Sequence, residues 1–428
     1  MARFAALLLA LTLAWVLGQT AAPEAAFRAT ALAVGVALVA AALVGRLTEK
    51  IALPRVTGYL LFGLVCGPYV ANIITRPMAR ELQIVNGLAV TLIAFVAGLE
   101  MNLRRLAPRL GVIARIGGVT ILLTYILIFV ALWTAWPWLH IAPDFRGLQR
   151  LAAAGLLTAL VASFSPTVSI AIVAEARAAG PFTELTLAIV ILADLVLILA
   201  FTFIMQFVRV VFGTASDVSV FAGVTWEVFG SFAFGALAGA LFAFYLRYVG
   251  REVAIAVLGL CALIAGLANT FQLEPLMAAL AAGLVVENLA PSSGDLVKEG
   301  VERSALPVLV VFFAAAGASL QLDALATLGW IALTLAAARM AAIWTSTKAG
   351  RMAAGLNDDI SAMTWMALVS QAGVTLGLTL IVEAELPGWG ATIATLMLAL
   401  IALHQLIGPV LYRAALARAG EVGRMGES

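Results

Sequence analysis

The sequence predicts an all-α polytopic membrane protein, and three observations carry this prediction: the composition, a succession of apolar segments and an internal repeat. Hydrophobic residues make up 64% of the 428 positions, and charged residues make up only 11%. An ordinary soluble protein has about 25% charged residues, so this chain lacks the side chains that a water-facing surface needs. Helices are expected because a segment in lipid must satisfy its own backbone polar groups.

Thirteen apolar segments approach the roughly 20 residues that a transmembrane helix needs. They lie near 29–45, 52–68, 83–100, 110–136, 149–174, 181–207, 218–246, 251–270, 275–290, 304–320, 325–346, 360–383 and 390–412. A further apolar stretch at 4–18 follows Arg3 and precedes Pro23, so residues 1–22 form either a signal peptide or a fourteenth helix. We therefore expect one membrane domain over 29–412 and a short tail at 413–428.

Lysine and arginine are divided unevenly between the loops, and in membrane proteins they favour the cytoplasmic side. The loops after the odd-numbered segments, together with the C-terminal tail, hold 17 of these residues, whereas the opposite loops hold six. This bias predicts a multi-pass protein of the cell's inner (plasma) membrane with a cytoplasmic C-terminus.

The composition also excludes several classes of protein. A net charge of +2 is too small to indicate a nucleic-acid partner. Cys66 and Cys261 both lie in apolar segments, and the chain has only two histidines, so neither a disulfide framework nor a resident metal site is indicated. No nucleophile–base pair is recognisable within the spans, so we expect neither an enzyme nor a cofactor.

The third observation is an internal repeat. The segment at 159–176 resembles that at 367–384 at a constant offset of 208 residues, with Ala-Leu-Val near the start, a central threonine and Glu-Ala at the end. Two shorter pairs of similar segments lie earlier in each half of the chain and keep the same order. They are 60–65 with 280–285 and 97–103 with 316–322. Partners are seven helices apart, so they cross the membrane in opposite directions. Such inverted-topology repeats are typical of secondary transporters, whose binding sites lie near the bilayer midplane.

Two helices of the repeat carry matching interruptions. Pro166 removes a backbone donor and clashes with the preceding turn, and Gly373 relaxes the helix in the equivalent place. The polar side chains near these two positions belong to Ser163, Ser165, Thr167, Gln371 and Thr375. Either the hydroxyls bond back to carbonyls of their own helices, or those of Ser163, Ser165 and Thr167 and the freed carbonyls offer oxygen ligands to a hard cation. In that second case Gln371 and Thr375 are expected behind these ligands, as supporting polar groups. The symmetry of the pair favours the cation site.

Asp194 lies about midway along the segment at 181–207, where a charged carboxylate is costly unless it is paired or hydrated. Because it can hold a proton or a desolvated cation but not both, competition between the two ions suffices for antiport. Arg339 is also deep in a span, and we expect it to pair either with helix-end carbonyls or with Asp194. A purely structural ion pair is the alternative. Glu227, Glu287 and His404 lie nearer span ends and are expected at the membrane interface.

At this point the residues resemble the monovalent cation/proton antiporter superfamily, the sodium/hydrogen exchanger membrane domain of the NapA and Kef type. The stretch Pro-Arg-Val-Thr-Gly-Tyr-Leu-Leu-Phe-Gly-Leu-Val-Cys-Gly-Pro at 54–68 is similar to the second-helix signature of that family, and 95–100 to the end of its third helix. The Ser-Pro-Thr at 165–167 resembles one of its two crossed, interrupted helices. Asp194 falls on the family's essential aspartate, and Arg339 falls where the family keeps a basic residue.

The resemblance implies a homodimer in which a core moves against a dimerisation part. By that analogy the dimerisation part covers about 29–100 and 251–320, the core covers about 110–207 and 325–412, and the segment at 218–246 links them. The implied function is exchange of a monovalent cation, Na⁺ or K⁺, for H⁺ by alternating access.

One departure qualifies this expectation. Many members place a second acidic or polar residue just before the aspartate, whereas this chain has Ala193. We therefore expect electroneutral exchange, one cation for one proton. The alternatives are a transport-inactive sensor or scaffold on the same fold, a channel-like K⁺ efflux protein and a Na⁺-coupled solute transporter.

Overall fold

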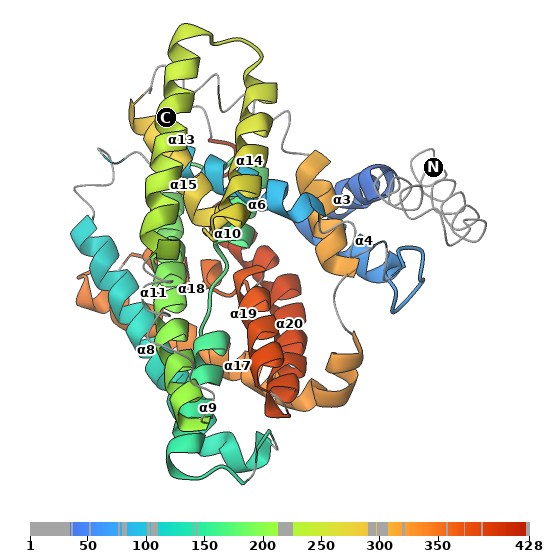
Figure 1. Cartoon of the computed structure of the whole chain (residues 1–428), viewed down its shortest axis with the longest axis vertical. Helices are drawn as coiled ribbons and strands as arrows, with labels where there is room; N and C mark the ends of the chain where they lie inside the picture. The colour runs from blue at the N-terminus through green and yellow to red at the C-terminus, as the bar shows by residue number, and fades with distance from the viewer. Residues whose placement is uncertain are drawn as a thin grey trace. The chain divides into compact units, whose positions relative to one another are not determined.

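The computed structural model describes residues 35, 37–50, 53–75, 78, 84–100, 103, 110–139, 141–142, 144–212, 226–289, 297, 307–318, 322–356, 358–371, 373–386 and 388–424. Every regular element within these residues is a helix (Figure 1). The predicted signal peptide or extra helix at 1–22 lies outside the described residues, as does the end of the predicted tail at 425–428.

The chain divides into two compact units. Unit 1 takes its described residues from Met1–Asn102, Ile170–Glu175 and Phe229–Leu320. Its helices are η1 (Ala37–Ala41), α3 (Ala42–Glu49), α4 (Arg55–Cys66), α6 (Ile84–Glu100), α13 (Ser231–Tyr248), α14 (Val253–Thr270), α15 (Pro275–Leu289) and an apolar helix at Pro307–Ala318.

Unit 1 is held together by close approach of helix backbones. A Cβ built on Gly98 of α6 would lie 2.2 Å from the carbonyl oxygen of Leu280 on α15, and one built on Gly317 would lie 2.1 Å from that of Leu60 on α4. Small residues allow such contact between membrane helices. In the sequence repeat α4 corresponds to α15, and Gly98 corresponds to Gly317. The two contacts are therefore related as the repeat requires.

Unit 2 takes its described residues from Leu103–Ser169, Ala176–Val228 and Gln321–Ser428. Its helices are α8 (Leu110–Leu139), α9 (Gly147–Val161), the first turn of α10 (Pro166–Ala176), α11 (Pro181–Phe212), α17 (Leu322–Ala353), η4 (Ser361–Met363), α18 (Thr364–Ala367), α19 (Gly373–Glu385) and α20 (Trp389–Arg418). The π-helical turn η3 (Trp226–Gly230) spans the boundary between the units. Within unit 2, α8 packs against α17, α9 against α11, and α19 against α20.

Four helical stretches in the described residues are long and apolar enough to cross a membrane, namely Leu110–Leu139, Gly147–Ala176, Ser231–Tyr248 and Trp389–Arg418. The second of them contains the break between α9 and α10. Shorter apolar helices coincide with several other predicted spans, among them Arg55–Cys66, Val253–Ala268 and Pro275–Leu289. The total of thirteen spans stays a prediction.

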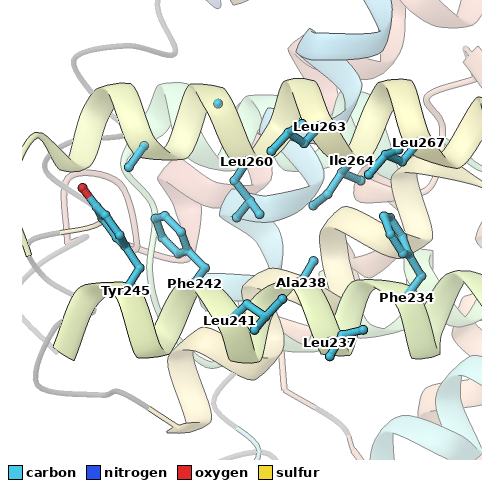
Figure 2. Close-up of a pocket in the computed structure, with 12 residues that line it drawn as sticks. Phe234, Leu237, Ala238, Leu241, Phe242, Tyr245, Leu260, Leu263, Ile264 and Leu267 are labelled. Carbon is cyan, nitrogen blue, oxygen red and sulfur yellow. The ribbon is translucent and has the colours of Figure 1, made fainter. Parts of the chain in front are cut away.

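A cavity of about 460 Å³ lies between α13 and α14 of unit 1 (Figure 2). Leucine and phenylalanine side chains dominate its lining, with Phe234 towards one end and the hydroxyl of Tyr245 towards the other. That hydroxyl already donates to the carbonyl oxygen of Arg251 at 2.6 Å. Because the lining offers so few oxygen ligands, this cavity does not suit a cation, and the polar residues of unit 2 are the better candidates.

Candidate functional site

Both helix interruptions that the sequence indicates are present in unit 2. Helix α9 ends at Val161 and α10 begins at Pro166, which needs no backbone donor at the first position of a helix. In the second half of the chain, α18 ends at Ala367 and α19 begins at Gly373. The residues between each pair of helices leave backbone carbonyls without intrahelical partners, so polar groups must satisfy them.

The two interruptions are joined by buried hydrogen bonds. The hydroxyl oxygens of Ser163 and Thr375 are 2.6 Å apart, although the residues are 212 positions apart in the chain. The Gln371 amide donates to Ser163 Oγ at 2.9 Å and to the carbonyl oxygen of Leu160 at 3.0 Å. Ser163 Oγ itself donates to that carbonyl oxygen at 2.8 Å. Its one proton and its lone pairs are thereby used, so in this arrangement Ser163 connects the interruptions.

The side-chain amide of Gln371 uses its nitrogen in hydrogen bonds but not its oxygen. Its side chain is 0% exposed, and its Nε2 faces the carbonyl oxygens of Leu160 and Val161, which fixes the orientation of the amide. The opposite atom, Oε1, has no hydrogen-bond partner among the described residues. A buried amide oxygen without a partner costs free energy, and it is the kind of ligand that a hard cation accepts.

Arg339 binds the backbone of both interruptions. The side chain is 0% exposed on α17. Its guanidinium donates to Val161 O and Val369 O, both at 2.7 Å, and also to Ser163 O. The planar fork of arginine suits several acceptors at fixed angles, and a positive charge is favourable beside the carbonyls at helix C-termini. Of the two partners expected from the sequence, the helix-end carbonyls accept hydrogen bonds from Arg339.

Asp194 lies in α11 and is 3% exposed. Helix α11 packs against α9 and against α18, the two helices that lead into the interruptions. The carboxylate also interacts electrostatically with Tyr125 of α8. Burial of a charged carboxylate is costly, and a bound proton or cation would offset that cost.

Ser165 and Thr167 flank Pro166 and are both buried. Ser165 Oγ accepts a long hydrogen bond of 3.4 Å from Val168 N, in the manner of a helix N-cap. Thr167 lies in the first turn of α10. Hydrogen bonds thus join Ser163, Thr375, Gln371 and Arg339, whereas Ser165, Thr167 and Asp194 lie in elements next to that network.

The sequence interpretation missed two features of the candidate site and misplaced a third residue. The backbone carbonyls that accept from Arg339 carry no side-chain signal. Tyr125 stands in an apolar run, which carries no signal of its electrostatic interaction with Asp194. His404, expected at the membrane interface, is 0% exposed within α20, with Nδ1 3.0 Å from the carbonyl oxygen of Leu400. Within the described residues, no group of three or more His, Cys, Asp or Glu side chains is placed to hold a metal ion.

An all-helical protein with broken helices meeting at buried polar residues has the architecture of a membrane transporter. Residues 34–413 match the model of the family "Sodium/hydrogen exchanger, transmembrane". The chain belongs to this family, which confirms the resemblance noted at 54–68. It is therefore an integral membrane transporter of an antiporter family and not an enzyme. The family name implies H⁺ and a monovalent cation as substrates.

Solved structures have the same fold. One is the sodium proton antiporter MjNhaP1 from Methanocaldococcus jannaschii at pH 8, with a TM-score of 0.67 and 17% identity over 92% of this chain and 99% of that chain. An electron-microscopy structure of MjNhaP1 has a TM-score of 0.72 and 18% identity, over 91% of this chain and 97% of the other. No curated protein matches the sequence. At these identities the likeness shows the fold alone.

Proposed function

We propose that this protein exchanges a monovalent cation, Na⁺ or K⁺, for H⁺ by alternating access. The observation that carries the proposal is the joining of two broken helices by Arg339 and Gln371, next to a helix that holds a buried aspartate. This arrangement supplies a negative charge, freed backbone carbonyls and an amide oxygen within one packed unit. The family and fold agree with it.

Each residue has a definite role in this proposal. Asp194 holds either the cation or the proton, and Gln371 Oε1 with the hydroxyls of Thr167 and Ser165 are the neutral oxygen ligands. Ser163 and Thr375 join the interruptions, so we assign them to positioning. Arg339 satisfies the helix-end carbonyls, which leaves the Asp194 carboxylate as the group that the incoming ion neutralises.

Exchange follows from the competition between the two ions. When the cation leaves, the bare carboxylate takes a proton, and only the neutralised site crosses to the other side because moving a buried charge is costly. Since Ala193 adds no second carboxylate, one proton replaces one monovalent cation. The cycle is therefore electroneutral.

We further propose that unit 2 is the moving core and unit 1 the dimerisation part of a homodimer with thirteen transmembrane helices and a cytoplasmic C-terminus. The proposal draws support from the two units, because 29–100 and 251–320 fall in unit 1 and most of 110–207 and all of 325–412 fall in unit 2. Residues 170–175, and the predicted linker from Phe229 onward, fall in unit 1 instead. Within unit 1 the symmetry-related glycine contacts support the inverted repeat. Within unit 2 the hydrogen bonds between the interruptions support crossed helices.

The decisive experiment uses purified protein in liposomes with an internal pH dye. A pulse of Na⁺ or K⁺ should dissipate a proton gradient, and Asp194→Asn should abolish the signal because the amide cannot exchange a proton. Asp144→Asn, which alters an exposed aspartate between α8 and α9, is the matched control and should keep full activity. Normal exchange by Asp194→Asn would contradict the site.

The same vesicles separate the alternatives. An electroneutral exchanger should be insensitive to an imposed membrane potential, whereas a channel-like K⁺ efflux protein would carry current without a proton gradient. A wild-type protein that binds no cation and moves no proton would instead indicate a sensor or scaffold.

A further inference from the structure

Helical hydroxyls usually donate to a carbonyl oxygen one turn back in their own helix. In unit 2 this holds for Thr134, Thr158, Thr186, Thr334, Thr345, Thr347, Thr379 and Thr395. Thr120 and Thr124 of α8 and Ser346 of α17 depart from this pattern. Each of the three is 0% exposed, and its hydroxyl has no hydrogen-bond partner in the described part of the chain. An unsatisfied buried hydroxyl costs free energy, so these three require a reason.

These hydroxyls lie along the packing of α8 against α17. A Cβ built on Gly350 of α17 would lie 2.7 Å from the carbonyl oxygen of Ile116 and 2.9 Å from Thr120 Oγ1, so Thr120 abuts this part of α17. Ser346 is one turn from Gly350, and Thr124 is one turn from Thr120, so each pair shares a helix face. The three hydroxyls therefore follow one seam between the two helices.

The seam leads towards Asp194. On the side of α8 that packs against α11, a Cβ on Gly117 would lie 3.4 Å from Leu192 and 3.5 Å from Ile189. Tyr125 is eight residues after Gly117, so it lies about 80° around α8 from Gly117, on the side away from Thr120. Its Oη is buried, has no hydrogen-bond partner among the described residues, and interacts electrostatically with Asp194.

We propose that Thr120, Thr124, Tyr125 and Ser346, here called the hydroxyl seam, bind a short file of water molecules that carries protons to and from Asp194. Buried water normally makes two to four hydrogen bonds to polar groups that are otherwise unsatisfied, which is the need these four side chains share. Ser346 is seven residues from the end of α17, or about 10 Å. In this proposal the file leads to the end of α17 that carries Lys348 and Arg351.

The seam deepens the proposed function and rests on it. Each hydroxyl and each water accepts one proton and passes one on, so none changes its charge, and the Asp194 carboxylate gains one proton as the cation leaves. Coupled exchange requires that the proton reach Asp194 through the seam only while the site faces the end of α17 that carries Lys348 and Arg351.

The test removes the hydroxyls while keeping the shape of the side chains. In liposomes, the triple variant Thr120→Val, Thr124→Val, Ser346→Ala should slow exchange at saturating Na⁺ about tenfold, equal to about 1.4 kcal/mol of barrier. The half-saturating Na⁺ concentration should stay unchanged, and the ratio of rates in H₂O and D₂O should rise. Thr347→Val is the matched control, because Thr347 is the buried neighbour of Ser346 and its hydroxyl bonds within its own helix.

Two further measurements keep the proposal falsifiable. Hydroxyl-radical labelling should modify Tyr125 in the wild type and less in the triple variant, whether or not the protein transports, so failure of the seam and failure of exchange are distinguishable. Thr120→Ser, which keeps the hydroxyl, should retain the wild-type rate even if the triple variant does not fold. A triple variant that exchanges at the wild-type rate and melts at a higher temperature would overturn the proposal.

Discussion

The two units differ in their most prominent buried contacts, although unit 2 also has a close backbone approach at Gly350. In unit 1, backbones touch where glycine leaves room, and a Cβ on Gly283 would lie 2.1 Å from the carbonyl oxygen of Phe95. In unit 2, broken helices meet through buried polar groups, among them Arg339 and Gln371. Close packing tolerates no added volume, whereas a buried polar network tolerates no lost partner. The comparison teaches that the close contacts of unit 1 depend on shape, whereas the interrupted helices of unit 2 depend on hydrogen bonds.

The strongest challenge to this comparison is at Arg339. Arg339→Leu leaves several carbonyl oxygens at the interruptions without a donor, so we expect a loss of about 3–5 kcal/mol in the free energy of unfolding. Arg339→Lys keeps the charge but lacks the fork, and should recover only part of the loss. Thermal melting in detergent measures both, with the exposed Arg146→Leu as control. A leucine variant as stable as the wild type would show that the interruptions do not depend on Arg339.

The corresponding test in unit 1 adds one methyl group. Gly283→Ala places a Cβ against the Phe95 carbonyl, so α6 and α15 must separate, and we expect a loss of about 1–3 kcal/mol. Gly266→Ala in α14 is the matched control because a Cβ there meets no atom within 4 Å. It should gain about 0.5–1 kcal/mol from the better helix propensity of alanine. Equal melting temperatures for the two variants would mean that the α6–α15 contact is loose.

Much of the fold follows from the sequence, because lipid leaves helices as the main choice for an apolar segment and the repeat indicates where helices break. Pro166 and Gly373 do begin α10 and α19, as their backbone chemistry suggests. Helix lengths were harder to predict: α17 extends to Ala353, seven residues past the apolar segment, because amphipathic residues continue a helix beyond the bilayer core.

The site was less predictable, because its geometry depends on contacts between distant segments. No spacing reveals that Ser163 and Thr375 touch, or that Arg339 donates to carbonyl oxygens. Similarly, the missing partners of Thr120 and Ser346 are visible only once neighbouring hydroxyls are seen to bond within their own helices. Sequence patterns identified the polar residues in the spans. Packing decides which of their polar atoms have hydrogen-bond partners and which have none among the described residues.

The smallest expected effect is at the exposed end of unit 2, where Asp358 precedes η4. Its carboxylate accepts a hydrogen bond of 2.7 Å from Ser361 N. Slight burial alone would raise its pKa, but the hydrogen bonds from Ser361 outweigh this and hold the pKa of Asp358 below the ordinary value of 3.8. A lowered pKa means that the native state favours the ionised form, so this stabilisation is present above pH 3.8 and is lost as the pH falls through the lower, folded-state pKa.

Asp358→Asn should therefore lower the melting temperature slightly at pH 6, and the difference from wild type should shrink as the pH falls below 3.8. The neighbouring Asp359→Asn removes the same charge and controls for it. Melting curves between pH 3 and pH 6 provide the measurement. If the difference in melting temperature stayed constant across that range, the Asp358 side chain would stabilise unit 2 through its shape and not through its charge. If the difference shrinks, polar groups contribute to the stability of unit 2 even at its exposed end.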